Sequence, residues 1–280
     1  MRTIHVAKIR DAVKELCLKA NFELRPDVLK ALKRALRKET DDRARGILAD
    51  IIENASMARR REIAICQDTG MVPVFIWIGQ GVRLAGGDLS AAVNEGVKRA
   101  YREGYLRTSV VDDPFLRKNT LTNTPVAVYT EIVRGSRVKI VVAPKGFGSE
   151  NKSQVRMFKP TASEKDIKEF IVEVVRKAGP DACPPLVLGV GIGGTFDMAA
   201  HLAKVALLRP LGSRHNKRHI ARLEAELLKR INALGIGPMA LGGRTTALGV
   251  NIVTFATHIA GLPVAVNVSC HATRGAEKVL

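Results

Sequence analysis

Apolar residues recur every three or four positions over the first 60 residues, which is the spacing of one face of an α-helix. The first run places Val6, Ile9, Val13, Leu16, Cys17 and Ala20 on one face. A second run begins near Pro26, and a third follows Thr40-Asp41-Asp42, a sequence typical of a helix N-terminus. The pattern predicts a helical N-terminal part over residues 1–60, with Cys17 in the core.

After residue 60, short apolar segments alternate with longer amphipathic segments, which indicates an α/β protein. Strands are expected at residues 72–78, 124–133, 137–142, 186–190, 250–256 and 264–268. Helices are expected at residues 88–104, 163–175, 197–208 and 220–234. Gly135-Ser136 predicts a hairpin turn between two of the strands. We expect a single domain over residues 1–280, with mixed β-sheets flanked by helices after the helical N-terminal part.

The composition fits a folded, soluble protein, because 46% of the 280 residues are hydrophobic and 26% are charged. No apolar run approaches the roughly 20 residues that a membrane-spanning helix needs. The N-terminus alternates charged and apolar residues, unlike the continuous apolar stretch of a signal peptide. A cytoplasmic protein is therefore expected.

The formal net charge of +18 raises the alternative of a nucleic-acid-binding module. The basic residues are spread along the chain, however, with clusters only at Arg59–Arg61 and at residues 213–219. Aromatic residues make up only 4% of the chain, so few side chains could stack on bases. The sequence favours instead a basic solvated surface, or a surface that meets an acidic partner.

Three of the four cysteines adjoin predicted strands. Cys66 and Cys183 each precede one, and Cys270 follows one, so the three can converge in space. No cysteine has another cysteine two residues away, which excludes zinc ribbons and ferredoxin-type runs.

Three thiolates suit an iron–sulfur cluster with one open iron. Zinc bound by these cysteines with His271 or His258 is a competing interpretation. Spacing alone does not decide between a metal centre and three unrelated core cysteines.

Two glycine-bearing segments could approach an anion. Residues 189–194 match the dinucleotide fingerprint, since they follow a predicted strand and precede a predicted helix. The acidic residue expected about 20 positions later is missing. A tight strand–helix turn or a carboxylate cradle remains for this segment. The segment Lys145–Lys152 has the same ambiguity.

Several segments together resemble the α subunit, the iron–sulfur half, of class I fumarate hydratases, a family that includes L-tartrate dehydratases. They are CQDTG at 66–70, NTPVAV at 123–128, KGFGSENKS at 145–153, ACPPLVLGVGIGGTFDMAAHLAKVALLRPLG at 182–212, LE at 223–224, LGIGPMALGGRTTALGVNI at 234–252 and THIAGLPVAVNVSCHATRG at 257–275. The resemblance implies a hydro-lyase subunit for reversible hydration of fumarate to (S)-malate. L-tartrate dehydratase and mesaconate hydratase subunits are the alternatives.

The resemblance also implies a cofactor. In the family, cysteines that match Cys66, Cys183 and Cys270 ligate a [4Fe–4S] cluster. The open iron of that cluster binds the hydroxyl and a carboxylate of the substrate.

Further site residues follow from the resemblance. Asp68 matches an acidic active-site residue, and His258 matches an active-site histidine. The expected substrate contacts are Gln67, Arg107, Gly146 and Gly148. The loop departs from single-chain members, which have a third glycine where this chain has Phe147. His271 and Arg274, which flank Cys270, are expected to support the cluster ligands.

Single-chain members of the family continue into a C-terminal domain that supplies a catalytic threonine and further cationic residues. The resemblance therefore implies a separate β subunit. We expect an α2β2 heterotetramer that acts on a small dicarboxylate, with no membrane partner.

Overall fold

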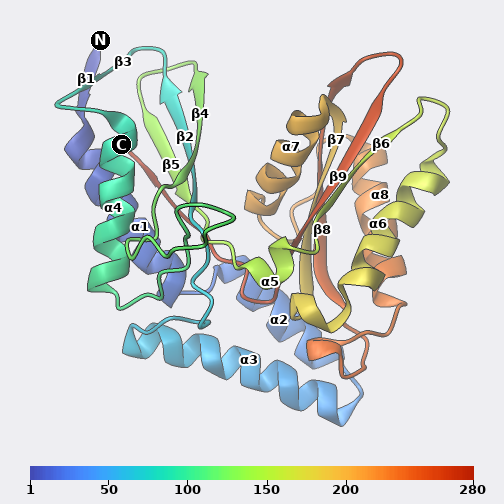
Figure 1. Cartoon of the computed structure of the whole chain (residues 1–280). Helices are drawn as coiled ribbons and strands as arrows, with labels where there is room; N and C mark the ends of the chain where they lie inside the picture. Colours follow the sequence, from blue (N-terminus) through green and yellow to red (C-terminus); the bar gives the residue numbers. More distant parts are fainter. The chain divides into compact units, whose positions relative to one another are not determined.

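The computed structural model describes all residues, 1–280, and confirms the α/β class (Figure 1). The chain divides into two compact units. Unit 1 comprises residues 1–25, 54–147 and 274–280, and unit 2 comprises residues 26–53 and 148–273. The expectation of one catalytic domain stays a prediction. None of the helices combines the length and apolar character that crossing a bilayer requires.

Unit 1 contains a four-stranded sheet in the order β10-β5-β2-β4. Its strands are β2 (Pro73–Gly79), β4 (Ala127–Val133), β5 (Val138–Val142) and β10 (Ala276–Val279). β2 pairs parallel with β4 and antiparallel with β5. The predicted hairpin between β4 and β5 is therefore wrong, because β2 lies between these two strands.

The turn at Gly135 passes over the end of β2 instead of closing a hairpin. A Cβ atom on Gly79 would lie 2.6 Å from the carbonyl oxygen of Gly135, and the Gly81 N–H donates to that oxygen over 2.9 Å. β2 has a paired strand on each edge, and nearly all of its residues are buried. This central position suits an apolar strand.

Helices α1 (Val6–Phe22) and α4 (Leu89–Glu103) cover one face of this sheet and pack on each other. The strands β1 (Arg2–His5) and β3 (Val82–Ala85) form a separate parallel pair. Cys17 is fully buried in this core, as predicted, and burial raises the pKa of its thiol to about 12. Asp88 caps α4 by accepting from the Ala91 N–H over 2.6 Å.

Unit 2 contains the sheet β6-β9-β7-β8. Its strands are β6 (Gln154–Phe158), β7 (Leu186–Gly194), β8 (Ala247–Thr257) and β9 (Leu262–Ser269). Helices α6 (Glu164–Ala178) and α8 (Arg218–Asn232) pack on one face, and α7 (Phe196–Leu208) packs on the other (Figure 1). Helix α2 (Pro26–Lys38) also belongs to this unit, whereas α3 (Asp42–Arg61) and α5 (Phe147–Glu150) include residues of both units.

The glycines of residues 189–194 serve the packing of α7 on β7. A Cβ atom on Gly189 would lie 2.1 Å from the Ala203 carbonyl oxygen, and one on Gly191 would lie 2.1 Å from the Ala199 carbonyl oxygen. Both glycines lie inside the strand, so the segment is not a phosphate-binding loop after it. The dinucleotide interpretation is wrong for this reason.

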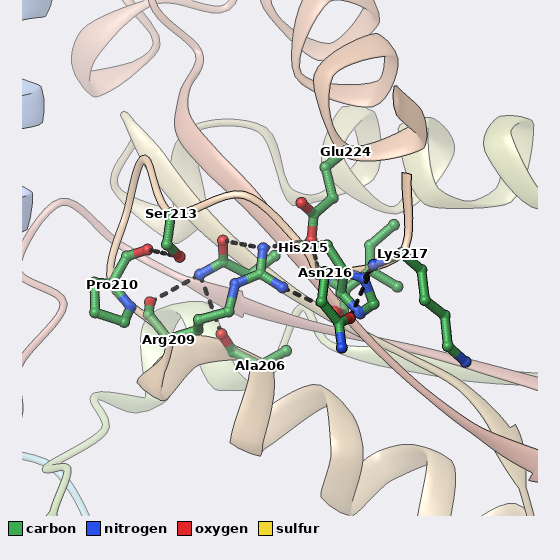
Figure 2. A network of polar contacts seen from close by, with 10 residues as sticks. Ala206, Arg209, Pro210, Ser213, His215, Asn216, Lys217 and Glu224 are labelled. Atoms are coloured by element: carbon green, nitrogen blue, oxygen red, sulfur yellow. Dashed lines mark hydrogen bonds and ion pairs between the residues drawn. The ribbon is translucent and has the colours of Figure 1, made fainter. Parts of the chain in front are cut away.

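A partly buried ion pair contacts the outer edge of β8, where no neighbouring strand is present (Figure 2). The Ile252 N–H donates to Glu224 over 2.8 Å, and the Ile252 carbonyl accepts from Arg209 over 3.1 Å. Arg209 and Glu224 also pair with each other, and Arg209 donates to Asn251 over 3.1 Å. The outward backbone groups of Ile252 are thereby satisfied without a fifth strand.

We expect Glu224→Ala to lower the free energy of unfolding by about 3–5 kcal/mol, because it leaves the Arg209 guanidinium without its buried partner. Glu226→Ala on the same helix is the matched control, since Glu226 pairs at the surface with Lys168. Its expected cost is at most about 1 kcal/mol. Urea unfolding of both variants measures the difference, and equal losses would contradict the role given to Glu224.

Candidate functional site

The Asp68 carboxylate joins two segments of unit 1. One oxygen accepts from the Gly70 N–H over 3.0 Å, and the other accepts from the Phe147 N–H over 2.8 Å. The N–H groups of Met71 and Lys145 each donate to the other's carbonyl, over 3.2 and 2.8 Å. The segment 66–70 and the loop 145–147, which are 79 residues apart, therefore form one constellation.

Arg274 supports this constellation from below the surface. Its guanidinium donates to the Asp68 carbonyl over 2.8 Å and to the Asn21 side chain over 3.0 Å. Arg274 is buried. Arg274 therefore contacts the backbone of Asp68 directly. Its expected support of the cluster ligand Cys270 stays a prediction.

Gly146 allows the loop to approach the Asp68 carboxylate closely. A Cβ atom at this position would lie 2.9 Å from one carboxylate oxygen and 3.5 Å from an Arg274 nitrogen. Gly70 meets the same loop from the other side, because a Cβ atom there would lie 2.4 Å from the Lys145 carbonyl. The two glycines are therefore needed where the segments touch.

Gly146→Ala should lower kcat/KM by about 100-fold, because the methyl group displaces the Asp68 carboxylate from its position. Gly46→Ala is the control, since a Cβ atom on Gly46 meets nothing within 4 Å. Steady-state kinetics of the hydro-lyase complex that the sequence resemblance implies, and thermal melting of each variant, check this expectation. Unchanged kinetics in Gly146→Ala would show that the close approach has no catalytic importance.

Arg107 lies beside the same segment through its backbone, because the Thr69 hydroxyl donates to the Arg107 carbonyl over 2.6 Å. The Arg107 side chain is exposed and has no ion-pair partner. Gln67 is also exposed, and its side-chain oxygen accepts from the Cys66 thiol over 3.4 Å. The structure thus brings Cys66, Gln67, Asp68, Arg107 and Gly146 into one part of unit 1.

Two further residues, Asn123 and Tyr101, hold this part together and were not among the site residues expected from the sequence. The buried Asn123 side chain donates to the Gly70 carbonyl over 3.0 Å and accepts from the Ser109 N–H over 2.8 Å. The Tyr101 hydroxyl donates to the carbonyls of Thr69 and Gly70. Asn123 opens the NTPVAV segment, which was a usable signal, whereas nothing around Tyr101 marks it.

Cys183 and Cys270 lie at the same end of the sheet in unit 2. Cys183 precedes β7, Cys270 follows β9, and these strands pair antiparallel with Val187 opposite Ser269. The His271 backbone and its ring nitrogen Nδ1 both contact the Cys183 carbonyl, at 3.3 and 3.1 Å. Burial lowers the pKa of His271, and the contact with this carbonyl opposes that shift.

The second half of the loop segment 145–153 is anchored near Cys270. The Asn267 side chain donates to Glu150 and to the Ser153 hydroxyl, over 2.7 Å in each case. Lys152 pairs with Asp181 over 2.6 Å in the 3₁₀ turn before Cys183. A Cβ atom on Gly148 would lie 3.3 Å from the Asp181 carbonyl oxygen. Gly148 therefore lies beside the turn that precedes Cys183 in unit 2.

His258 is not brought to these cysteines. It lies exposed in the turn between β8 and β9, where Thr257 pairs with Gly194 at the far end of β7. From Leu186 to Gly194 the strand advances by about 26 Å at roughly 3.3 Å per residue. Within unit 2, His258 and the pair Cys183 and Cys270 thus occupy opposite ends of the sheet.

The predicted ligand set is divided between the units, with Cys66 in unit 1 and the other two cysteines in unit 2. The four cysteines form no disulfide, and all except Cys17 are partly exposed. No three histidine, cysteine, aspartate or glutamate side chains form a group that could hold a metal ion in the structure.

Comparison with known proteins gives one consistent result. The model of the family Fumarate hydratase (Fumerase) matches residues 10–279. A Methanocaldococcus jannaschii protein, named provisionally as L(+)-tartrate dehydratase subunit alpha, is 42% identical over 277 residues, which are 97% of each chain. The L(+)-tartrate dehydratase subunit alpha of Escherichia coli strain K12 is 30% identical over 272 residues, covering 96% of this chain and 89% of that protein.

Proposed function

Because this chain belongs to the fumarate hydratase family, we propose that it is the cluster-bearing subunit of a hydro-lyase that reversibly hydrates fumarate to (S)-malate. The main observation that supports this proposal is the arrangement of residues around Asp68. A carboxylate two residues from Cys66 is held by main-chain N–H groups from two segments, and its own segment contacts the backbone of the exposed Arg107 through Thr69. A proton acceptor and a cation for a carboxylate are what this reaction requires.

The donor set of Cys66, Cys183 and Cys270 fits a [4Fe–4S] cluster, because three thiolates leave one iron open. When bound there, the cluster supplies a Lewis acid that makes hydroxide a tolerable leaving group from malate. Cys183 and Cys270 are already neighbours, and Gln67 contacts the Cys66 thiol. Zinc is not part of the proposal, since the resemblance to the family implies iron and sulfide at these cysteines.

Asp68 would transfer a proton or orient the substrate hydroxyl. Its two hydrogen bonds from backbone N–H groups fix the carboxylate in position, so little reorganisation accompanies the reaction. Arg107 would bind a substrate carboxylate, which a planar guanidinium can do through two parallel hydrogen bonds. Gln67 and the loop at Gly146 and Gly148 would complete this chain's part of the substrate site.

A separate β subunit is part of the proposal, in an α2β2 assembly. Both relatives carry the name subunit alpha, which implies a partner for those proteins. Large apolar side chains of this chain are exposed in the segment that follows α4 and contains Arg107. They are Tyr105, Phe115, Leu116 and Leu121, with exposed fractions of 96%, 92%, 84% and 77%. Large apolar side chains exposed in one segment are compatible with a surface that another protein covers.

L(+)-tartrate dehydration is the second candidate, because both relatives are named for it. Fumarate hydration is favoured by the loop KGFGSEN and by Gly193-Gly194-Thr195, which resemble fumarases more closely. Both reactions remove or add water next to a carboxylate, so the residues assigned above would keep their roles.

The test is to assemble the two subunits anaerobically, verify iron and sulfide, and assay fumarate, L(+)-tartrate and mesaconate in parallel. We expect turnover of fumarate by the complex and none by this chain alone with its cluster reconstituted. Turnover of tartrate without fumarate would establish the second candidate. Robust turnover by this chain alone would contradict the division of the active site between subunits. A colourless preparation that retains RNA would support a nucleic-acid-binding module instead.

A further inference from the structure

A cavity of about 470 Å³ lies in unit 2 beside the outer edge of β8. Its volume is in the range of about 300–1,000 Å³ that is typical of small-molecule sites. The lining contains none of the predicted cluster ligands or substrate contacts. The hydration reaction therefore leaves this cavity unexplained.

Four arginines from three segments line the cavity. Arg34 belongs to α2, Arg214 to the loop before α8, and Arg218 and Arg222 to the first turns of α8. All four are exposed, and none has an ion-pair or hydrogen-bond partner in the structure. Four positive charges thus face one concave surface without a carboxylate to balance them.

The acidic residue of the lining does not compensate these arginines. The Glu224 carboxylate, which is the only one there, is engaged by Arg209 and by the Ile252 N–H (Figure 2). The Ser213 side chain in the same loop as Arg214 is also engaged locally, since its hydroxyl donates to the Pro210 carbonyl over 2.6 Å. Figure 2 shows these contacts of Arg209, Glu224 and Ser213.

The N-terminus of α8 lacks the groups that usually stabilise the start of a helix. Its N-cap residue, Lys217, makes no capping hydrogen bond with its side chain, and the first turn has no acidic residue. The N-terminus of a helix carries a partial positive charge, so cations there are unfavourable. Arg218 and Arg222 also repel each other, because residues four apart lie on the same face. An anion bound at this end would offset both effects.

The other part of the lining is apolar. Ala225 and Leu228 follow Arg218 and Arg222 on the same face of α8, and Leu248 and Val250 line the cavity from β8. A guanidinium group binds phosphate oxygens through two parallel hydrogen bonds. A ligand with a polyanionic end and an apolar or aromatic body matches this division.

We propose that this cavity binds a phosphorylated small molecule, such as a nucleoside polyphosphate. Its phosphate groups contact Arg34, Arg214, Arg218 and Arg222, and its body lies on the apolar wall formed with Leu228 and Leu248. The site uses no residue assigned to hydration, so its occupancy and the hydratase reaction can be measured independently.

Isothermal titration calorimetry of the full chain with ATP, AMP, pyrophosphate and citrate tests the proposal. We expect ATP to bind at least tenfold more tightly than pyrophosphate or citrate. The double variant Arg218→Gln/Arg222→Gln should weaken ATP binding at least tenfold. The control Arg59→Gln/Arg61→Gln removes the same charge from the exposed end of α3 and should change binding less than twofold.

A second variant separates binding from the folding of α8. Arg34→Gln leaves that helix unaltered and should still weaken ATP binding measurably, with an unchanged circular dichroism spectrum. Equal losses in the pocket variant and the control would indicate general charge attraction and overturn the proposal. Pyrophosphate or citrate binding as tightly as ATP would overturn it too, because the apolar wall would then be unused. Preference for a short RNA over every nucleotide would assign the arginines to nucleic acid.

Discussion

Replacement of Cys66, Cys183 or Cys270 by serine, one at a time, is expected to lower fumarate hydration at least about 1,000-fold. Such a loss corresponds to roughly 4 kcal/mol of barrier, which is within the several kcal/mol that a Lewis-acid metal supplies. Serine removes a thiolate ligand, and two remaining cysteines cannot hold a cubane cluster. The visible absorption and the iron content of each variant should fall together with its activity.

Cys17→Ala is the matched control, because it also removes one thiol, but from the core of unit 1 and not from the predicted ligand set. It should keep its iron and its activity and lose only some stability, since the substitution removes a buried sulfur atom. Alkylation of the cluster-free chain gives an independent readout. Cys17 should resist iodoacetamide at pH 8, because it is fully buried and its pKa is about 12. Full cluster content in any one of the three serine variants would remove that cysteine from the ligand set.

Asp68→Asn is expected to abolish turnover while the assembled enzyme keeps its iron. Asparagine preserves the shape of the side chain but loses the charge and the proton acceptor. The structure adds a second consequence. Both carboxylate oxygens accept backbone N–H groups, from Gly70 and Phe147, whereas the asparagine amide can accept at only one of these positions. Some loss of stability should therefore accompany the loss of turnover.

Asp166→Asn separates the two effects. Asp166 closes the capping box of α6 by accepting from the Ser163 N–H over 2.8 Å through a single carboxylate oxygen. Asparagine removes the charge there, while its amide oxygen can still accept this hydrogen bond. This hydrogen bond holds the pKa of Asp166 below its usual range. The variant should keep full turnover and lose a little stability, because the remaining hydrogen bond is no longer charge-assisted. Activity of Asp68→Asn within about tenfold of the parent, which is about 1.4 kcal/mol of barrier, would make Asp68 structural.

Particular elements show how far sequence patterns reach. The helices expected from residues 88 and 163 are present, and Asp88 and Ser163 are their caps. A cap and its helix are neighbours in the chain, so the local sequence is sufficient to predict them. The turn at Gly135 was equally evident, yet its two strands lie on either side of β2. Strand order depends on contacts between distant segments, and the turn residues carry no information about them.

The candidate site divides in the same way. The segment around Cys66 and Asp68 was found from its residues, but its contact with the loop at Gly146 and with Arg274 requires the fold. His258 was expected with the cysteines, whereas the sheet separates them by the length of β7. Tyr101 holds the Asp68 segment from a helix that had no visible connection to it.

By itself, the sequence determined the α/β class, the main helices and strands, the burial of Cys17 and the family, because these follow from periodicity, capping and contiguous motifs. Only the tertiary structure decided the strand order, the packing role of Gly189 and Gly191, and the grouping of four arginines beside β8. The physical reason is the range of the interactions. Local hydrogen bonds and helical spacing act over a few residues, whereas sheet pairing, close packing and convergent charges join residues that are far apart in the chain.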